Sequence, residues 1–207
     1  MWYQGIFLAA AFSWCLAGLR NTTKETPIVS IKNGTYIGVR SESYKQDWFL
    51  GIPYAQPPIG ELRFRVPHHL NSSWEGTRAV TKYSAACVGY GGDEKFYDQL
   101  SEDCLYLNIL RPSGYENAKL PVAFWMHGGG FFQGSTQDKR YNLSFIVQQS
   151  IEIGKPMIAV SINYRVSAWG FLLGKEVLES GQTNLGLRDQ RLAMHWIQEN
   201  IAAFGGK

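Results

Sequence analysis

Residues 121–131 read PVAFWMHGGGF, and this stretch decides the fold. Its first six residues are continuously apolar, which is typical of a strand buried on both faces. Three consecutive glycines end the strand, because glycine adopts backbone torsions that other residues avoid. A second apolar run, residues 157–162 (MIAVSI), follows a helix predicted over residues 141–153. Two buried strands separated by a helix predict a parallel pair covered by helices.

The segments upstream of this stretch also predict strands. Residues 28–39 alternate apolar and polar around an Asn-Gly pair, the strongest local signal for a β-hairpin. Residues 48–55 predict a further strand, and residues 105–112 (LYLNILRP) alternate with period two, as in a half-buried strand.

Downstream, residues 184–204 predict a long helix with Asn184 as its N-cap and two glycines after its end. Four apolar residues would form its buried face: Leu185, Leu192, Trp196 and Ile201. The sequence therefore predicts an α/β fold with a mixed, mostly parallel sheet and flanking helices.

The composition is that of a globular protein, with 207 residues, 45% hydrophobic and 18% charged. The net charge is +3 without a run of basic residues, which argues against a nucleic-acid partner. The histidines and cysteines are scattered and lack metal-ligand spacing. We therefore expect no metal and no cofactor.

An uncharged apolar segment, residues 5–19, lies near the start of the chain. Its length fits the apolar core of a signal peptide and is too short to span a bilayer comfortably. Small residues favour cleavage after Ala17, so we expect a signal peptide at 1–17, one partial domain at 18–207 and no stable membrane insertion. The first four residues lack the usual positive charge, which leaves a buried or membrane-anchoring N-terminus as the alternative.

Two further features favour a secreted protein. Four N-x-S/T sequons are candidates for glycosylation: Asn21, Asn33, Asn71 and Asn142. Removing the signal peptide would also remove Cys15 and leave Cys87 and Cys104, an even count that suggests a disulfide in an oxidising compartment. Two buried free thiols are the alternative.

The glycines at 128–130 carry the candidate chemistry. Their amide N–H groups are not covered by side chains, and at the carboxyl end of a parallel strand they can point at a developing oxyanion. One such donor contributes on the order of 3 kcal/mol to a transition state. An HGGG element of this kind forms the oxyanion loop of lipases and esterases. Taken alone, the motif could also be a plain flexible turn.

Several blocks in order resemble the type-B carboxylesterase/lipase family of cholinesterase-like α/β-hydrolases. Residues 102–112 (EDCLYLNILRP) match a family signature position by position, and residues 51–64 (GIPYAQPPIGELRF) resemble its N-terminal block. Further matches follow in the same order: NYR at 163–165, WGF at 169–171, NLGLRDQ at 184–190 and FGG at 204–206. The resemblance covers residues 27–207 and is strongest to fungal secreted members. It implies the N-terminal part of an α/β-hydrolase fold, truncated before the strand of the nucleophile elbow.

The resemblance also implies roles for individual residues. Gly129 and Gly130 match two glycines whose N–H groups form part of the oxyanion hole, and the cysteine pair matches the family's first disulfide. Two structural ion pairs, which we expect to be largely buried and costly to break, are implied: Arg63 with Glu102, and Arg165 with Asp189. His127 is interpreted as a positional residue of the loop, and His195 as a packing or surface residue.

No serine stands in a G-x-S-x-G sequence, and the family's Ser, Glu or Asp, and His triad would fall beyond Lys207. We therefore expect no catalytic residue in this chain. The prediction is an N-terminal fragment of a secreted serine carboxylic-ester hydrolase, inactive alone, whose full-length parent acts on a small-molecule or lipid ester. The alternatives are a non-catalytic member, adhesion-type or binding, and a truncated product that acts only by binding.

Overall fold

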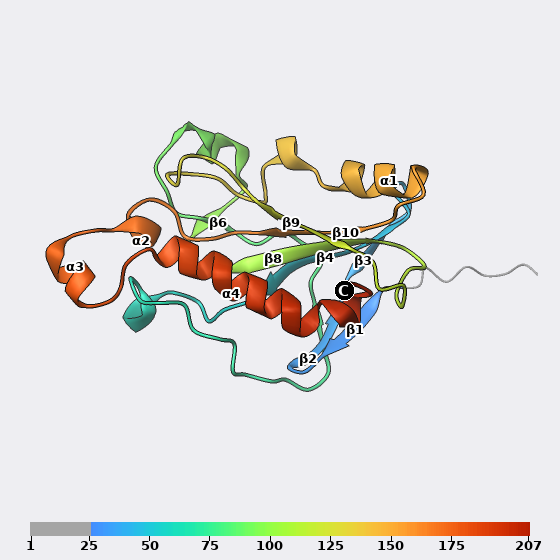
Figure 1. Cartoon of the computed structure of the whole chain (residues 1–207), viewed down its shortest axis with the longest axis horizontal. Helices are drawn as coiled ribbons and strands as arrows, with labels where there is room; N and C mark the ends of the chain where they lie inside the picture. Colours follow the sequence, from blue (N-terminus) through green and yellow to red (C-terminus); the bar gives the residue numbers. More distant parts are fainter. Residues whose placement is uncertain (1–25) are drawn as a thin grey trace, which may run out of the picture.

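The computed structural model describes residues 26–207 (Figure 1). The expected signal peptide, Cys15 and the sequon at Asn21 lie outside the described residues. Within 26–207, no helix is both long enough and apolar enough to cross a membrane. In the same range, no three or more His, Cys, Asp or Glu side chains gather where they could hold a metal ion.

A five-stranded mixed sheet forms the centre of the molecule, with the strands in the order β3 (Val39–Ser41), β4 (Gln46–Pro53), β8 (Tyr106–Pro112), β10 (Ile158–Ile162) and β9 (Val122–Met126). Strands β9 and β10 are parallel, whereas the other three neighbouring pairs are antiparallel. The prediction of a mostly parallel sheet is therefore wrong for this chain. A parallel pair needs a long crossover, and among these strands only β9 and β10 are joined through an α-helix, α1 (Ser144–Glu152).

Strand β9 lies at the edge of the sheet, beside the fully buried strand β10. Most β9 side chains are half-buried, and Met126 is 41% exposed. Residues 205–207 lie beside Leu120, just before the start of β9. The N–H of Leu120 donates to the carbonyl oxygen of Gly205 at 2.8 Å, and the N–H of Lys207 donates to the carbonyl oxygen of Leu120 at 3.0 Å. The apolar run that was predicted to be buried on both faces is only half-covered, because its outer edge has no partner strand among residues 26–207.

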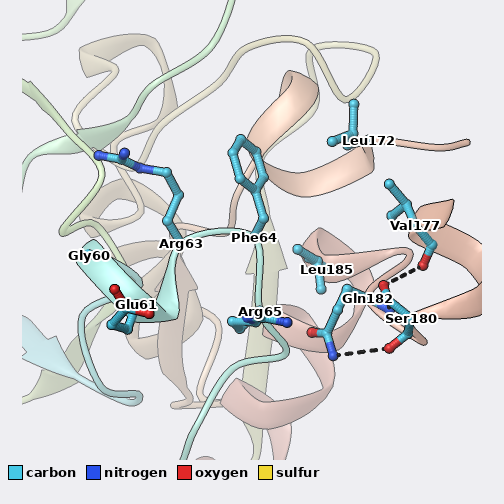
Figure 2. A pocket seen from close by; sticks show the side chains of 10 residues that line it. All are labelled: Gly60, Glu61, Arg63, Phe64, Arg65, Leu172, Val177, Ser180, Gln182 and Leu185. Carbon is cyan, nitrogen blue, oxygen red and sulfur yellow. Dashed lines mark hydrogen bonds between the residues drawn. The ribbon is translucent and has the colours of Figure 1, made fainter.

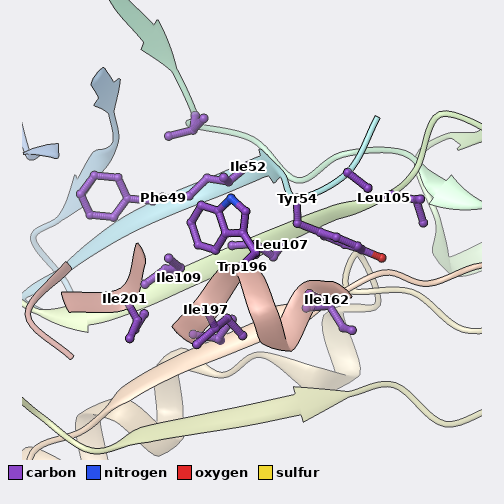
Figure 3. Packing of buried hydrophobic residues seen from close by; sticks show 14 of the residues in the cluster. Phe49, Ile52, Tyr54, Leu105, Leu107, Ile109, Ile162, Trp196, Ile197 and Ile201 are labelled. Carbon is purple, nitrogen blue, oxygen red and sulfur yellow. The ribbon is translucent and has the colours of Figure 1, made fainter. Parts of the chain in front are cut away.

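Helices cover both faces of the sheet (Figure 1). Helix α4 (Leu185–Asn200) lies on one face and α1 on the other, and a 3₁₀-helix (Ile201–Phe204) continues α4. The predicted apolar face of α4 is confirmed: Leu185, Leu192, Trp196 and Ile201 are all buried. Trp196 and Ile201 lie in one buried cluster with Ile109 of β8 and with Phe49 and Ile52 of β4 (Figure 3). Each such buried side chain contributes roughly 1.5–3 kcal/mol.

The two ends of α4 differ in how well they fit the sequence prediction. Asn184 precedes the helix, but its backbone is left-handed (φ 52°) and its side chain makes no capping hydrogen bond, so the predicted side-chain cap is wrong. Gly205 follows the 3₁₀-helix with φ +87°, a conformation that favours glycine, so the predicted end is confirmed.

Strand β8 was predicted to be half-buried and is instead buried on both faces, because α1 and α4 cover opposite sides of the sheet. The polar residue on the α1 side, Asn108, is hydrogen-bonded through both ends of its amide: it donates to the hydroxyl of Ser161 at 3.1 Å and accepts from the N–H of Gly51 at 2.9 Å. Most buried polar groups in protein cores are satisfied in this way.

Smaller elements surround the central sheet. The predicted hairpin is confirmed as β1 (Ile28–Ile31) and β2 (Gly34–Ile37), which pair antiparallel. The remaining elements are β5 (Thr77–Ala79), β6 (Ala86–Cys87), β7 (Leu100–Ser101), α2 (Ser167–Phe171), α3 (Lys175–Glu179) and 3₁₀-helices at Gly60–Leu62, Gly92–Phe96 and Lys139–Tyr141.

A buried charged cluster, which the sequence analysis did not predict, lies at the end of the sheet where β9 and β10 begin. The Asp47 carboxylate accepts hydrogen bonds from Arg40 Nε at 2.8 Å, Arg111 Nη2 at 3.0 Å and the Ser113 hydroxyl at 2.9 Å. Burial alone would raise the pKa of Asp47, but these partners together hold that pKa below its usual value. The cluster joins β3, β4 and β8 at the end of the sheet opposite the glycine loop.

Candidate functional site

The glycine loop directly follows the carboxyl end of β9, at the edge where the parallel strands β9 and β10 both end. Its backbone is left-handed at three successive positions: Gly129 (φ +118°), Gly130 (φ +61°) and Phe131 (φ +65°). A Cβ atom on Gly129 would overlap the carbonyl oxygen of Gln133, whereas one on Gly130 would have its nearest neighbour at 3.7 Å. The tight turn therefore requires glycine most strongly at position 129.

The amides of Gly129 and Gly130 are the polar groups that this turn leaves uncovered. Both residues are exposed, and neither N–H has a hydrogen-bond acceptor within residues 26–207. The carbonyl of Gly129 is occupied instead, because it accepts from the N–H of Phe132 at 3.1 Å. Two adjacent free N–H groups at the end of a parallel strand are suited to bind an anionic oxygen.

His127 begins the loop, and its side chain is buried rather than presented to a substrate. Its ring stacks on Tyr164 with centroids 4.3 Å apart, and its Nδ1 lies 3.1 Å from the carbonyl oxygen of Gly128. Burial lowers the pKa of His127 to about 4, so the ring is neutral at pH 7. Its Nε2 atom is buried and has no hydrogen-bond partner in the described part of the chain. These contacts agree with a positional role.

His195 lies on the exposed side of α4, well separated in sequence from the loop, and contributes no contact to it. The sequence analysis interpreted His195 as either a packing or a surface residue, and the structure shows a surface residue.

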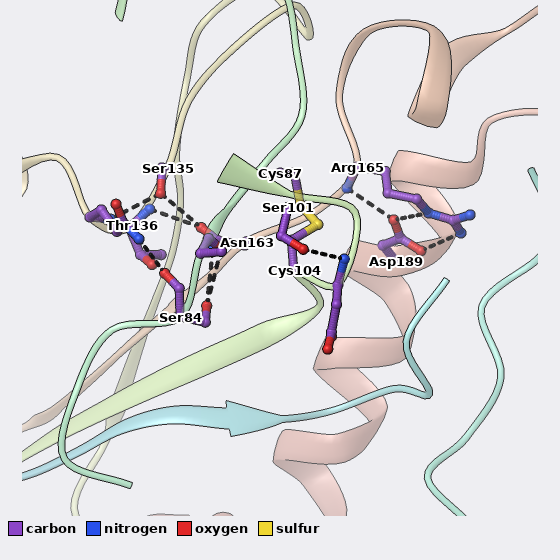
Figure 4. The surroundings of a disulfide bond; sticks show 12 residues. Ser84, Cys87, Ser101, Cys104, Ser135, Thr136, Asn163, Arg165 and Asp189 are labelled. Carbon is purple, nitrogen blue, oxygen red and sulfur yellow. Dashed lines mark hydrogen bonds and ion pairs between the residues drawn. A yellow bond between two sulfur atoms is a disulfide. The ribbon is translucent and has the colours of Figure 1, made fainter. Parts of the chain in front are cut away.

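Arg165 and Asp189 form a buried ion pair between the segment after β10 and helix α4 (Figure 4). Arg165 donates from Nε and Nη2 to the two carboxylate oxygens at 2.8 and 2.7 Å, and its backbone N–H donates at 3.0 Å. Burial raises the pKa of the Asp189 carboxyl, and these bonds from Arg165 offset only part of that rise. The pair joins the segment after β10 to helix α4.

Arg63 and Glu102 also pair, with Nε and Oε2 2.6 Å apart, but the pair is not largely buried. The Arg63 side chain is 49% exposed and that of Glu102 is 21% exposed. The expectation of burial is wrong here because Arg63 lies on a surface turn just after the 3₁₀-helix Gly60–Leu62. Water screens such a pair, so it stabilises the fold far less than a buried pair does.

The predicted disulfide between Cys87 and Cys104 is present, with both residues buried (Figure 4). Asn163 lies close by and connects three segments. Its Oδ1 accepts from the N–H of Thr136 at 2.9 Å, and its Nδ2 donates to the carbonyl oxygen of Ala85 at 3.0 Å. The segment just before Cys87 and the segment after the glycine loop are thus held at fixed positions relative to β10.

A hollow of about 370 Å³ lies away from the glycine loop (Figure 2). It is lined by the turn around Gly60 and by residues of α3 and its flanks, among them Gln182, which accepts from the N–H of Val66 at 2.7 Å. None of the residues at 127–131 lines it, so the hollow does not extend the candidate site.

The three sequons within the described residues differ in their surroundings. Asn33 is 9% exposed, and its Nδ2 uses both hydrogens, donating to the carbonyl oxygens of Leu70 and Ser72 at 3.1 and 2.8 Å. Asn71 is exposed. The Oδ1 of Asn142 accepts from the N–H of Ser144 at 3.0 Å, which leaves its Nδ2 without a protein partner among residues 26–207. The structure therefore argues against a glycan at Asn33.

The mixed sheet, the two helical layers and the loop after β9 define a mixed α/β chain that matches esterase structures over part of their length. Aspergillus niger EstA matches with a TM-score of 0.75 and 37% identity, and a PNB esterase with a TM-score of 0.78 and 34% identity. These matches cover 87% and 88% of this chain but 34% and 36% of the esterase chains. A model of the carboxylesterase family matches residues 25–207, and the chain belongs to that family.

The most similar curated relatives include three fungal lipases. Lipase 2 of Diutina rugosa is 38% identical over 93% of this chain, Lipase 1 of Geotrichum candidum is 38% identical over 97%, and Secreted lipase 1 of Botryotinia fuckeliana (strain B05.10) is 39% identical over 87%. The matches cover 38%, 39% and 34% of those proteins. The chain therefore spans little more than a third of the length of its relatives.

Proposed function

We propose that this chain supplies the oxyanion donors of a serine carboxylic-ester hydrolase. The observation that carries the proposal is the pair of unpartnered amides at Gly129 and Gly130, beyond the carboxyl end of a parallel strand. In the proposed reaction a serine hydroxyl attacks the ester carbonyl and passes its proton to a histidine. The carbonyl electron pair moves onto the oxygen, which the two amides stabilise until the carbonyl re-forms and the alcohol leaves with the proton from the histidine. Water then attacks the resulting acyl-enzyme in the same way, which releases the acid and returns the proton to the serine.

The nucleophile and its partners are proposed to come from sequence that follows Lys207, since no G-x-S-x-G occurs in residues 1–207. The bridge between Leu120 and Gly206 supports this arrangement, because it directs the chain along the free edge of β9. A strand added there would end next to the glycine loop. The chain without that strand would hold the donors but lack the group that attacks the ester.

A fluorophosphonate probe, which labels activated serines, tests this proposal. We expect no labelling and no hydrolysis of p-nitrophenyl esters by residues 18–207 alone. The protein extended by the coding sequence downstream of Lys207 should be labelled at one serine and should hydrolyse these esters. An extended protein that carries no G-x-S-x-G and takes up no probe would instead support the second candidate, a non-catalytic binding member of the same fold.

The substrate proposed is a small-molecule or lipid carboxylic ester. The names of the relatives support this class, since they include lipases and an esterase. The segment between the two disulfide-bonded cysteines is short and contains no tryptophan, which favours a general ester over a long-chain triglyceride or a choline ester. A panel of p-nitrophenyl esters with increasing acyl length would measure this preference.

Secretion of the protein is also proposed, supported by the disulfide and by relatives whose names describe secreted lipases. Glycopeptide mapping of folded protein from a glycosylating host should find glycans at Asn71 and Asn142 and none at Asn33. A glycan at Asn33 would remove a buried hydrogen bond and would have no space in the fold. Occupied Asn33 in folded, soluble protein would contradict this expectation.

A further inference from the structure

The segment that follows β10 holds the glycine loop at both ends. At the first end, the Tyr164 hydroxyl donates to the carbonyl oxygen of His127 at 2.8 Å, and the two rings lie nearly parallel at 9°. At the second end, the N–H of Ser167 donates to the carbonyl oxygen of Phe131 at 2.6 Å. Between these two contacts lie only the glycines at 128–130.

Glycines resist rotation of their peptide planes less than other residues do, so the direction of their N–H groups depends on what holds the flanking residues. The Tyr164 hydroxyl fixes the peptide plane between His127 and Gly128, since it fixes the carbonyl oxygen of that plane. The stacked ring fixes the His127 side chain, whose Nδ1 contacts the next carbonyl along the loop. Tyr164 is 2% exposed, and burial raises its pKa, so its hydroxyl stays a donor.

We propose that Tyr164 is a positioning residue for ester hydrolysis: its hydroxyl and ring orient His127, and through it the Gly129 and Gly130 amides, toward the developing oxyanion. This inference rests on the proposed function. Tyr164 touches neither the substrate nor the reacting atoms in this scheme, and it acts only through the backbone of the loop.

Tyr54 provides a matched control. It is equally buried, and its hydroxyl donates at 2.7 Å to the carbonyl oxygen of Asn163, in the same segment after β10. That bond does not reach the glycine loop. Tyr54→Phe and Tyr164→Phe therefore each remove one buried hydroxyl and one bond to a backbone carbonyl, and they differ in whether the carbonyl belongs to the loop.

The experiment uses the complete hydrolase that contains this chain. We expect Tyr164→Phe to lower kcat about tenfold, less than the 10²–10³-fold loss on removing an oxyanion donor outright, with KM changed by less than twofold. A trifluoromethyl ketone inhibitor forms an oxyanion on binding, so its inhibition constant should rise by the same factor as kcat falls. Tyr54→Phe should lower the melting temperature by a similar amount but leave kcat and this inhibition constant unchanged.

Equal kcat values for Tyr164→Phe and Tyr54→Phe would overturn the positioning role while leaving the proposed function intact. Unaltered complete protein without esterase activity would overturn both, so the two failures are distinguishable. If Tyr164→Phe does not fold, His127→Asn replaces it, since it keeps a donor near the Nδ1 position but removes the stacked ring. A kcat for His127→Asn equal to that of unaltered protein would also overturn the proposal.

Discussion

Replacing Gly129 with alanine is expected to lower the kcat of the complete hydrolase at least ~100-fold, the loss typical of a displaced oxyanion donor. The added Cβ would overlap the carbonyl oxygen of Gln133, a backbone atom that can move only if the turn opens. The φ of +118° is also one that alanine avoids. The amide remains, but it would no longer point where the oxyanion forms.

Gly130→Ala is the control for this prediction. Its φ of +61° lies in the left-handed region that alanine tolerates at about 1–2 kcal/mol, and the new Cβ would meet its nearest neighbour at 3.7 Å. We expect a loss in kcat at least tenfold smaller than that for Gly129→Ala, measured with a p-nitrophenyl ester at saturation. A Gly129→Ala enzyme with kcat within twofold of the unaltered enzyme would show that these amides do not bind the oxyanion.

Asp189→Asn is expected to reduce the free energy of unfolding by about 3–5 kcal/mol. The substitution would leave the Arg165 guanidinium, which is 3% exposed, without its charged partner. Such a charge cannot be neutralised by deprotonation, because arginine retains its proton in proteins. Urea denaturation followed by circular dichroism measures the change.

Glu102→Gln is the matched control, because it also removes the carboxylate from an arginine pair. The Arg63 guanidinium can turn to water, so we expect the urea midpoint to stay unchanged within error. Equal shifts of the midpoint for the two variants would show that burial does not distinguish the two ion pairs. That outcome would support the expectation from the sequence alone that both ion pairs are costly to break.

Much of the local structure could be predicted because local chemistry decides it. The Asn-Gly pair predicted the β1–β2 hairpin, and the spacing of Leu185, Leu192, Trp196 and Ile201 predicted the buried face of α4. The predicted disulfide is present. Asn184 does occupy the N-cap position, but its backbone is left-handed and its side chain makes no capping hydrogen bond, which the sequence did not predict.

The sequence by itself determined the positions of the hairpin, of strands β4, β8, β9 and β10, and of the long helix. It also determined where three glycines interrupt the chain after an apolar strand, and which family the ordered motifs indicate. Only the tertiary structure decided that the sheet is mainly antiparallel and that the Arg63 side chain is exposed. It alone also decided that the Asn33 side chain donates both its hydrogens to backbone carbonyls, and that Tyr164 and Ser167 hold the glycine loop by hydrogen bonds. The physical reason is separation along the chain. A turn or an apolar periodicity depends on neighbouring residues, whereas Tyr164 reaches a carbonyl 37 residues away, and such a contact exists only after β9 and β10 have paired.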